Sequence, residues 1–297
     1  DGYFCEDGAA KAVAASGIRA IVSQGVIDFP APGVADPRIN VKAAEAFVFR
    51  WQDKLSHLIP SIFCHSPYTC SPETLTKAKD ICRQHGILFQ IHLAETKNEV
   101  EEIQKRYGRR PVDHLNALGL LDAETLCHHA VWVTGEEIEL LAKNGVGVSH
   151  NPESNMKLAS GVAPLPTMLA NGVKVGLGTD GCASNNNLDM FQEMDTAAKL
   201  HKVHWGDPTL CSAVQVAAMA CSGGASALGL SGELGSLEPG KKADIVTIDI
   251  IHTLLTPMYD PCSHLVYAAR GNDAIHSVIN GQLVMEGRNL LSIEVDE

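Results

Sequence analysis

The chain of 297 residues is long enough for one large domain, or for one domain with an appendage. Apolar residues make up 45% of it and charged residues 20%, which excludes a disordered or fibrous protein. The formal net charge of −12 opposes non-specific binding to nucleic acid, and no apolar run is long enough to span a bilayer.

The nine cysteines are scattered along the chain and include no C-x-x-C pair. An odd and dispersed set does not suit a disulfide framework, so we expect a protein of the reducing cytoplasm. We also expect a homo-oligomer, whose subunit number the sequence leaves open.

Short apolar or β-branched runs alternate with stretches of helical spacing over roughly the first two thirds of the chain. In the stretch 72–85, for example, Leu75, Ala78 and Ile81 share one helix face. Strand–helix–strand alternation predicts right-handed βαβ units and a parallel sheet. Neither phosphate-binding glycine motif occurs, which favours a barrel over a nucleotide-binding open sheet. The expected strands are 18–26, 59–65, 87–92, 125–129, 146–150 and 173–180.

The pattern changes after residue 205, where two helical stretches, 208–219 and 225–228, precede a turn-rich segment. The Asn280-Gly281 pair predicts a tight hairpin between two short strands. We therefore expect a barrel at residues 1–232 and a small antiparallel module at 233–297. The strands expected in this module are 243–249, 275–280 and 282–285.

The stretch 99–110 is unusually rich in charged residues. Helical segments of this composition usually face solvent. We therefore expect a solvated helix face here rather than a functional cluster.

Ionisable residues recur where the expected strands end. In a parallel barrel, catalytic groups collect at the C-terminal ends of the strands. Core packing does not readily produce five such ends in succession, so we expect a site there. The role of His150 among them stays open. These residues are His65, His92, His129, His150 and Asp180.

Two of these side chains are candidate metal ligands, because imidazole nitrogen and carboxylate oxygen are the usual non-sulfur ligands of zinc. They are His92 and Asp180, and Glu95 follows His92 closely enough to shuttle a proton at the site. The alternative role for Glu95 is a helix N-terminal acid stabilised by the dipole. His129 would orient the water, and we expect only one of the adjacent His128 and His129 to face the barrel mouth.

Several long motifs resemble the amidohydrolase superfamily. More narrowly, they are similar to its methylthioadenosine/S-adenosylhomocysteine deaminase branch, whose pattern is shared with the s-triazine chlorohydrolases. The resemblance covers essentially the whole chain. It is carried by HSPYTCS at 65–71, HLAET at 92–96, HAVWVT at 129–134, SHNPESNMKLASG at 149–161, GTDGCASNN at 178–186 and GSLEPGKKADIV at 235–246.

The resemblance implies a distorted (β/α)8 barrel with one divalent metal, usually zinc, and a small β-sandwich built from both chain ends. It implies that His92 and Asp180 bind the metal, that Glu95 shuttles a proton, and that His129 orients the water. His65 and Glu95 would contact a nucleoside substrate. The implied reaction is deamination: hydroxide attacks a carbon of the adenine ring, Glu95 protonates the adjacent ring nitrogen, and ammonia leaves. His65 stands where a second metal would need a lysine, which implies one metal.

The resemblance also requires an H-x-H pair at the end of the first barrel strand, and the sequence contains none. Its opening, Asp1-Gly2-Tyr3-Phe4, resembles the family's sequence just after the second strand. We therefore expect a truncated chain that lacks about two barrel strands and the leading sandwich strands. Two protein ligands are fewer than the usual three of catalytic zinc, so we expect this chain itself to be inactive.

The family branch often places an arginine after the third strand, where it meets the carboxylate of an amino-acid tail. Gln24 stands at that position, and Arg38 is the nearest remaining arginine, with a surface role as its alternative. We expect Gln24 or Arg38 to face the substrate tail, and a methyl or deoxy 5′ group to be accepted at least as well as homocysteine.

Two other functions stay open. The same site could release a halide or an alkylamine from a triazine ring, although Glu95 favours deamination because ring-nitrogen protonation assists the loss of ammonia. The chain could also be an inactive truncated barrel kept for assembly, which only the missing H-x-H pair supports.

Overall fold

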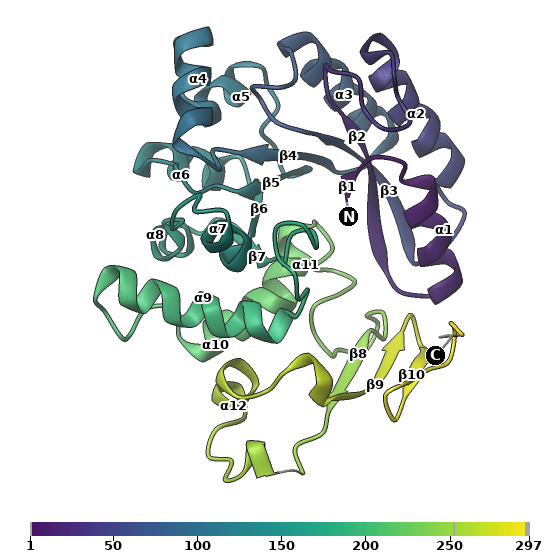
Figure 1. Ribbon diagram of the computed structural model, residues 1–297, viewed down its shortest axis with the longest axis vertical. Helices are drawn as coiled ribbons and strands as arrows, with labels where there is room; N and C mark the ends of the chain where they lie inside the picture. Colours follow the sequence, from purple (N-terminus) through teal and green to yellow (C-terminus); the bar gives the residue numbers. More distant parts are fainter. Residues whose placement is uncertain (1, 252, 295–297) are drawn as a thin grey trace.

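The computed structural model describes residues 2–251 and 253–294 as a curved parallel sheet covered by helices, with a smaller antiparallel sheet beside it (Figure 1). The larger sheet has seven strands that pair in chain order. This arrangement confirms the predicted α/β class and is that of an incomplete (β/α)8 barrel with a small C-terminal sheet. The parallel strands are β1 (Gly2–Tyr3), β2 (Ala20–Val26), β3 (Leu58–Cys64), β4 (Phe89–Leu93), β5 (Thr125–His129), β6 (Gly147–His150) and β7 (Lys174–Leu177).

All six predicted strands are confirmed as β2 to β7, with ends that differ by at most three residues. The two-residue strand β1 is additional, and it is too short to leave a periodic signal in the sequence. It pairs in parallel with β2 through Gly2 and Tyr3.

Helices follow the strands and cover one face of the sheet. The predicted helix at 72–85 is confirmed in full, because the Ser71 hydroxyl caps its first turn and Gly86 ends it with a φ of 61°. The helices of this layer are α1 (Asp7–Ser16), α2 (Asn40–Trp51), α3 (Pro72–His85), α4 (Lys97–Tyr107), α5 (Pro111–Ala117), α6 (Gly135–Lys143), α7 (Pro152–Lys157), α8 (Leu165–Ala170) and α9 (Met190–Trp205).

The helix expected at 208–219 is shorter, and its predicted start is wrong. Ser212 and Gln215 form a capping box, so α10 begins at Ala213 and spans Ala213–Ala218. A π-helical turn, Met219–Gly223, then leads into the short α11 (Gly224–Ala227).

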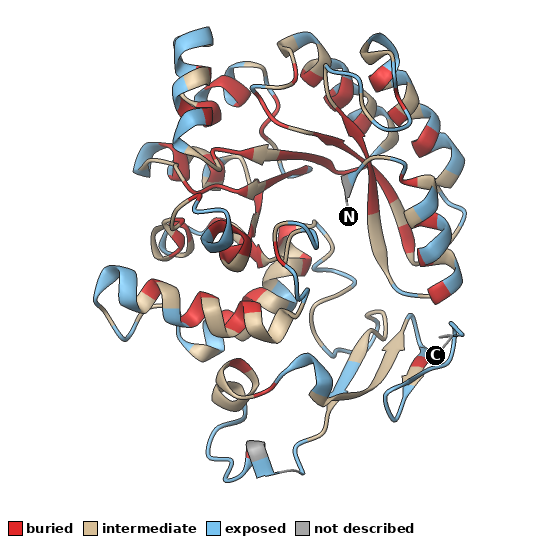
Figure 2. Cartoon of the chain, in the orientation of Figure 1, coloured by how far each residue is buried: buried red, intermediate tan, exposed pale blue. Residues whose placement is uncertain are grey.

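The core lies between the parallel strands and the helix layer, and Figure 2 shows buried residues concentrated on these strands. Ile62, Ile91 and Val148 are among the fully buried residues on the helix-facing side. On the opposite, inner side, Ser61 and Gln90 are also buried. This alternation fixes which side each strand residue faces.

α11 lies against the inner side of β6 and β7. A Cβ on Gly147 would lie 2.1 Å from the carbonyl oxygen of Ala227, and one on Gly176 would lie 2.7 Å from the Cα of Gly224. Only glycine permits so close an approach of helix and strand.

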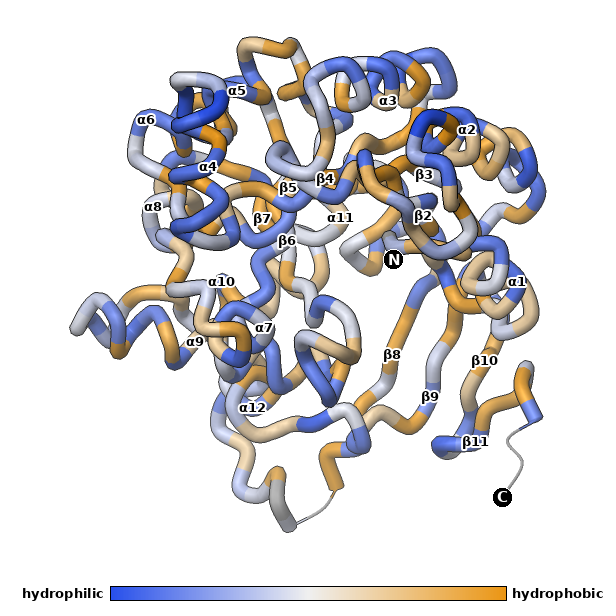
Figure 3. Tube along the Cα trace, turned by 45° about the horizontal axis from the view of Figure 1, so that its top comes forward, coloured by the Kyte–Doolittle hydropathy of each residue, from blue (hydrophilic) through white to orange (hydrophobic). Residues whose placement is uncertain are grey.

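The smaller sheet pairs antiparallel in the order β11-β10-β9-β8. The predicted hairpin is confirmed, because Asn280 and Gly281 both have positive φ, 52° and 78°. Its strands carry hydrophobic stretches but are mostly half-buried or exposed (Figures 2 and 3). They are β8 (Ile245–Ile248), β9 (Ala274–Ile279), β10 (Gln282–Glu286) and β11 (Asn289–Leu290).

Several contacts join this C-terminal part to the barrel. Helix α12 (Pro261–Tyr267) packs against α9 and α10 and places Val266 in the main core. Arg19, just before β2, donates two hydrogen bonds to Asp244. The division at residues 232 and 233 stays a prediction.

Two further observations concern the chain as a whole. All nine cysteines are free, as the scattered pattern predicts. Among the described residues, no helix combines the length and the apolar composition that a membrane crossing requires.

Candidate functional site

Histidines from three neighbouring strand ends form one cluster at the C-terminal edge of the parallel sheet. The ring of His92 lies at its centre, with centroids 5.2 Å from His65, 5.9 Å from His128 and 5.3 Å from His129. The expectation that only one of the adjacent His128 and His129 faces this site is wrong. His129 has a φ of 72°, and this left-handed turn at the strand end brings both rings beside His92.

His92 is held in one tautomer by the backbone. Its Nδ1 lies 2.7 Å from the carbonyl oxygen of His65, which can only accept, so Nδ1 carries the proton. Burial, followed by the neighbouring histidines, lowers the pKa of His92 well below its usual value. The neutral ring therefore presents the Nε2 lone pair, which is the form that binds a metal.

Glu95 and His129 face each other across the site. The Nε2 of His129 lies 3.9 Å from Oε2 of Glu95, while its Nδ1 donates to Oδ1 of Asn155 over 2.8 Å. The Ser160 hydroxyl donates to the other oxygen of Glu95, Oε1, over 3.1 Å. One carboxylate oxygen is thus held by Ser160, and the other faces the imidazole.

Asp180 follows β7 with a φ of 61°. Its Oδ2 accepts from the Ser154 hydroxyl and its Oδ1 from the amide of Gly181, each over 2.7 Å. In the part of the chain that the structure covers, no three His, Cys, Asp or Glu side chains are grouped so that they could hold a metal ion. His92 and Asp180 are therefore two candidate ligands without a third.

His65 directly follows β3 and lies beside the His92 ring. Its Nδ1 lies 2.9 Å from Oγ1 of Thr69 and 3.3 Å from Oγ of Ser66. Burial lowers its pKa, and the charge of Glu95 opposes this shift. The ring is thus held at Nδ1, which leaves Nε2 for another partner.

His150 takes no part in this cluster. Its Nε2 lies 3.0 Å from Nε2 of His201 on α9, and both side chains are fully buried. Burial lowers the pKa of His150 well below its usual value and that of His201 to about 4. His150 therefore joins β6 to α9 as a neutral partner of His201.

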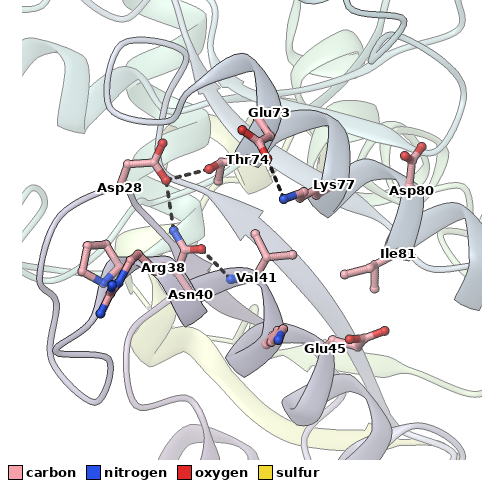
Figure 4. Close-up of a pocket in the computed structure, with 12 residues that line it drawn as sticks. Asp28, Arg38, Asn40, Val41, Glu45, Glu73, Thr74, Lys77, Asp80 and Ile81 are labelled. Carbon is pink, nitrogen blue, oxygen red and sulfur yellow. Dashed lines mark hydrogen bonds and ion pairs between the residues drawn. The ribbon is translucent and has the colours of Figure 1, made fainter.

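The structure does not bring Gln24 or Arg38 to the histidines. Gln24 pairs in register with Ile62 and so shares its helix-facing side, with Nε2 3.4 Å from the carbonyl oxygen of Gly25. The side chain of Arg38 is 87% exposed and bonds to Asp36. It borders a groove between α2 and α3 that also contains Asp28 (Figure 4).

A buried polar network lies beneath the cluster on the inner side of the sheet. The amide nitrogen of Gln90 donates to the hydroxyls of Ser23 and Ser61, so its Oε1 accepts from Nε2 of His128 over 3.2 Å. Burial lowers the pKa of His128 to about 3. The network thus keeps His128 neutral, with its proton on Nε2.

Sequence reasoning missed four residues that contact the site. Ser154, Asn155 and Ser160 lie within the motif at 149–161, so that motif was the available signal. The fourth is Glu99. We expected a solvated helix face at 99–110, and this expectation is wrong for Glu99, whose side chain is buried with only 3% exposed. The available signal was its spacing from Thr96, since T-x-x-E is typical of a capping box at a helix start.

Comparison with known proteins gives a family match over most of the chain. The amidohydrolase family model matches residues 4–284. A 5-methylthioadenosine/S-adenosylhomocysteine deaminase of Syntrophobacter fumaroxidans is 49% identical, over 100% of this chain and 68% of its own length. A 5′-deoxyadenosine deaminase of Methanopyrus kandleri is 42% identical over the same shares of the two chains.

Solved structures show the same fold. An adenosine deaminase from Xanthomonas campestris with bound zinc superposes with a TM-score of 0.95 at 35% identity, covering 98% of this chain and 66% of its own. The zinc complex of an atrazine chlorohydrolase from Arthrobacter aurescens has a TM-score of 0.91 at 22% identity. The match covers 99% of this chain and 69% of the chlorohydrolase. The chain thus spans about two thirds of the length of the relatives that it matches.

Proposed function

The chain belongs to the amidohydrolase family, and on this premise we propose that the protein deaminates adenine nucleosides by hydrolysis. The proposed substrates are methylthioadenosine, S-adenosylhomocysteine and 5′-deoxyadenosine. Relatives with 42–49% identity carry deaminase names for these compounds, which supports the proposal. The observation that carries it is the placement of Glu95 opposite His129, whose ring in turn lies beside the neutral His92.

The described residues supply two of the ligands that a divalent metal would need. His92 presents Nε2, and Asp180 keeps lone pairs on both oxygens beyond its two hydrogen bonds. We propose zinc as the metal, held by these two residues and by the H-x-H pair that the family pattern requires. When bound, it supplies a Lewis acid that lowers the pKa of a water molecule. With two ligands alone, we expect the 297-residue chain to be inactive.

Glu95 moves the proton at its Oε2. Because Ser160 donates to Oε1, Oε2 is the oxygen free to take a proton and deliver it to the ring nitrogen of adenine. Protonation of that nitrogen makes the adjacent ring carbon more electrophilic, and the amino group then leaves as ammonia. His65, on the other side of His92, contacts the substrate in this proposal.

His129 and Asp180 orient the attacking water. With its Nδ1 donating to Asn155, the His129 ring directs Nε2 toward the site, where it faces Glu95. Asp180 holds its carboxylate between Ser154 and Gly181, takes a proton from the water as the water oxygen bonds to the ring carbon, and gives that proton to the departing amino group. Both residues leave strands through left-handed backbone, a strained conformation that is common at catalytic sites.

Triazine hydrolysis is the alternative that the fold leaves open. The triazine hydrolases share 22% identity with the chain, so their likeness concerns the fold alone. The test uses the completed protein, meaning this chain preceded by a segment that carries the H-x-H pair. We expect ammonia release from methylthioadenosine and no chloride release from a chloro-s-triazine. Chloride release without nucleoside deamination would overturn the proposal, and metal binding without either activity would favour the inactive barrel.

A further inference from the structure

Glu99 is a buried carboxylate for which the proposed chemistry has no use. It lies in the first turn of α4 and is 3% exposed. Burial raises its pKa to about 7, so the surroundings oppose its charge. A carboxylate in such a place is normally retained because other groups need it as a hydrogen-bond acceptor.

Both oxygens of Glu99 bind the turn that carries Glu95. Oε1 accepts from the backbone amide of Ala94, and Oε2 accepts from the backbone amide of Glu95, each over 2.8 Å. Ala94 has a φ of 48°, so the chain reverses here between β4 and the helix. Two successive amides that would otherwise lack partners in this turn are thus held by one side chain.

A comparison within the chain shows that this is not ordinary helix capping. At the start of α6, Glu137 accepts from the amide of Thr134, the capping residue three positions before it. Glu99 occupies the same position after its own capping residue, Thr96. Its carboxylate instead reaches one and two residues further back, to the residues that precede the helix.

We propose that Glu99 is a positioning residue that fixes the Ala94–Glu95 turn and so places the Glu95 carboxylate against His129. The inference rests on the proposed function, in which Glu95 transfers a proton. In this role Glu99 holds the backbone of that turn and does not contact the substrate. Since a misplacement of about 1 Å can reduce turnover about a hundredfold, the effect should be measurable.

The test compares Glu99→Gln with Glu137→Gln. A glutamine at position 99 keeps the size of the side chain but has a single acceptor oxygen, so one of the two amides loses its partner. In the 297-residue chain, hydrogen exchange at Ala94 and Glu95 should become about tenfold faster or more in Glu99→Gln. Exchange there should not change in Glu137→Gln, which makes the same substitution at the matched position of α6, where a single acceptor oxygen is enough for the amide of Thr134.

The second readout is steady-state kinetics of the completed protein. We expect Glu99→Gln to lower kcat by about ten- to a hundredfold, with KM for methylthioadenosine changed by less than about threefold and metal content unchanged. Glu137→Gln should change kcat by less than about twofold. Unchanged exchange at Ala94 and Glu95, or faster exchange with unchanged kcat, would overturn the assignment. Failure of the proposed function is separate, because it would show as no ammonia release from methylthioadenosine by the completed protein, whereas hydrogen exchange in the 297-residue chain tests the contacts of Glu99 without activity.

Discussion

A single backbone acceptor determines the chemistry that His92 can offer. The carbonyl oxygen of His65 accepts a hydrogen bond from Nδ1–H of His92. Burial and the neighbouring imidazoles oppose protonation of Nε2. His128 and His129 are oriented in the same way, by Gln90 and Asn155. His92 and His128 are therefore neutral rings with defined lone pairs, which suits a cation better than an anion.

At this scale, the first prediction concerns Glu95. Glutamine keeps the shape and can still accept from Ser160, but it cannot carry the proton. In the completed protein, we expect Glu95→Gln to keep its metal and to lose about 10²–10⁴-fold in kcat. Elemental analysis and ammonia release, measured on the same preparation, check this. Parallel loss of metal and activity would make Glu95 a ligand or a structural residue.

A second prediction concerns the 5′ substituent of the substrate. Gln24 has no charge and faces the helix layer, and Arg38 is bound to Asp36 at the surface. A carboxylate that is taken out of water needs a cation to offset its lost solvation. We therefore expect kcat/KM for methylthioadenosine or 5′-deoxyadenosine to equal or exceed that for S-adenosylhomocysteine.

Two variants of the completed protein check this assignment of the tail. Arg38→Ala should leave the ratio of the two kcat/KM values unchanged. A preference for S-adenosylhomocysteine that disappears in Arg38→Ala would show that Arg38 binds the tail and that the prediction is wrong. Gln24→Arg should raise the relative activity on S-adenosylhomocysteine only if position 24 reaches the tail.

At the scale of elements, the contact of α11 with β6 and β7 depends on glycine. Gly147→Ala would force a Cβ against the carbonyl of Ala227, so we expect about 1–3 kcal/mol of lost stability. Gly135, at the start of α6, has nothing within 4 Å of such a Cβ and serves as the matched control. Gly135→Ala should be neutral or stabilising by up to about 1 kcal/mol. Thermal unfolding of both variants measures the two changes in stability. Equal changes would contradict the close packing of α11 against Gly147.

The loop after β7 is tied to α9 by another buried acid. Glu193 is fully buried, accepts from Asn185 over 2.6 Å, and has a pKa that burial raises to about 8. Because its pKa is higher in the folded than in the unfolded state, it lowers the stability progressively as the pH rises from about 4.5 to about 8. Below that window the side chain is protonated in both states, and this contribution is absent.

Glu193→Gln should remove this pH dependence. Between about pH 5 and pH 8, the variant should gain stability relative to the natural protein by an amount on the order of 3 kcal/mol. Urea unfolding of both proteins at the two pH values measures the change. Glu99, whose pKa is also raised, makes the same pH-dependent contribution to stability in both proteins, so this contribution cancels in the comparison. A constant difference between the two proteins would show that the pKa of Glu193 is not raised.

For the whole molecule, the sequence predicts the strand order and the edge where the histidines meet. The strands are readable because apolar runs end abruptly in ionisable residues, as at His65 and His92. Side-chain direction is less readable, since a shift of one residue reverses the side that a strand residue faces. Gln24 shows this, because its neighbours Ser23 and Gly25 take the inner positions.

Side-chain partners were the hardest feature to predict. The spacing of Glu99 from Thr96 predicts a bond to the amide of Thr96, whereas the carboxylate binds the amides of Ala94 and Glu95. The inner network of Ser23, Ser61, Gln90 and His128 joins residues up to 105 positions apart, 128 − 23, and no local pattern marks it. Such contacts depend on tertiary packing rather than on periodicity.

The central claim is that the protein is a deaminase with one metal, and a metal titration of the completed protein tests it most directly. Ammonia release from methylthioadenosine is measured on metal-free protein as zinc is added. We expect negligible turnover without metal and full turnover at about one equivalent of zinc per chain. Undiminished turnover in the metal-free protein, or a requirement for two equivalents, would contradict the account.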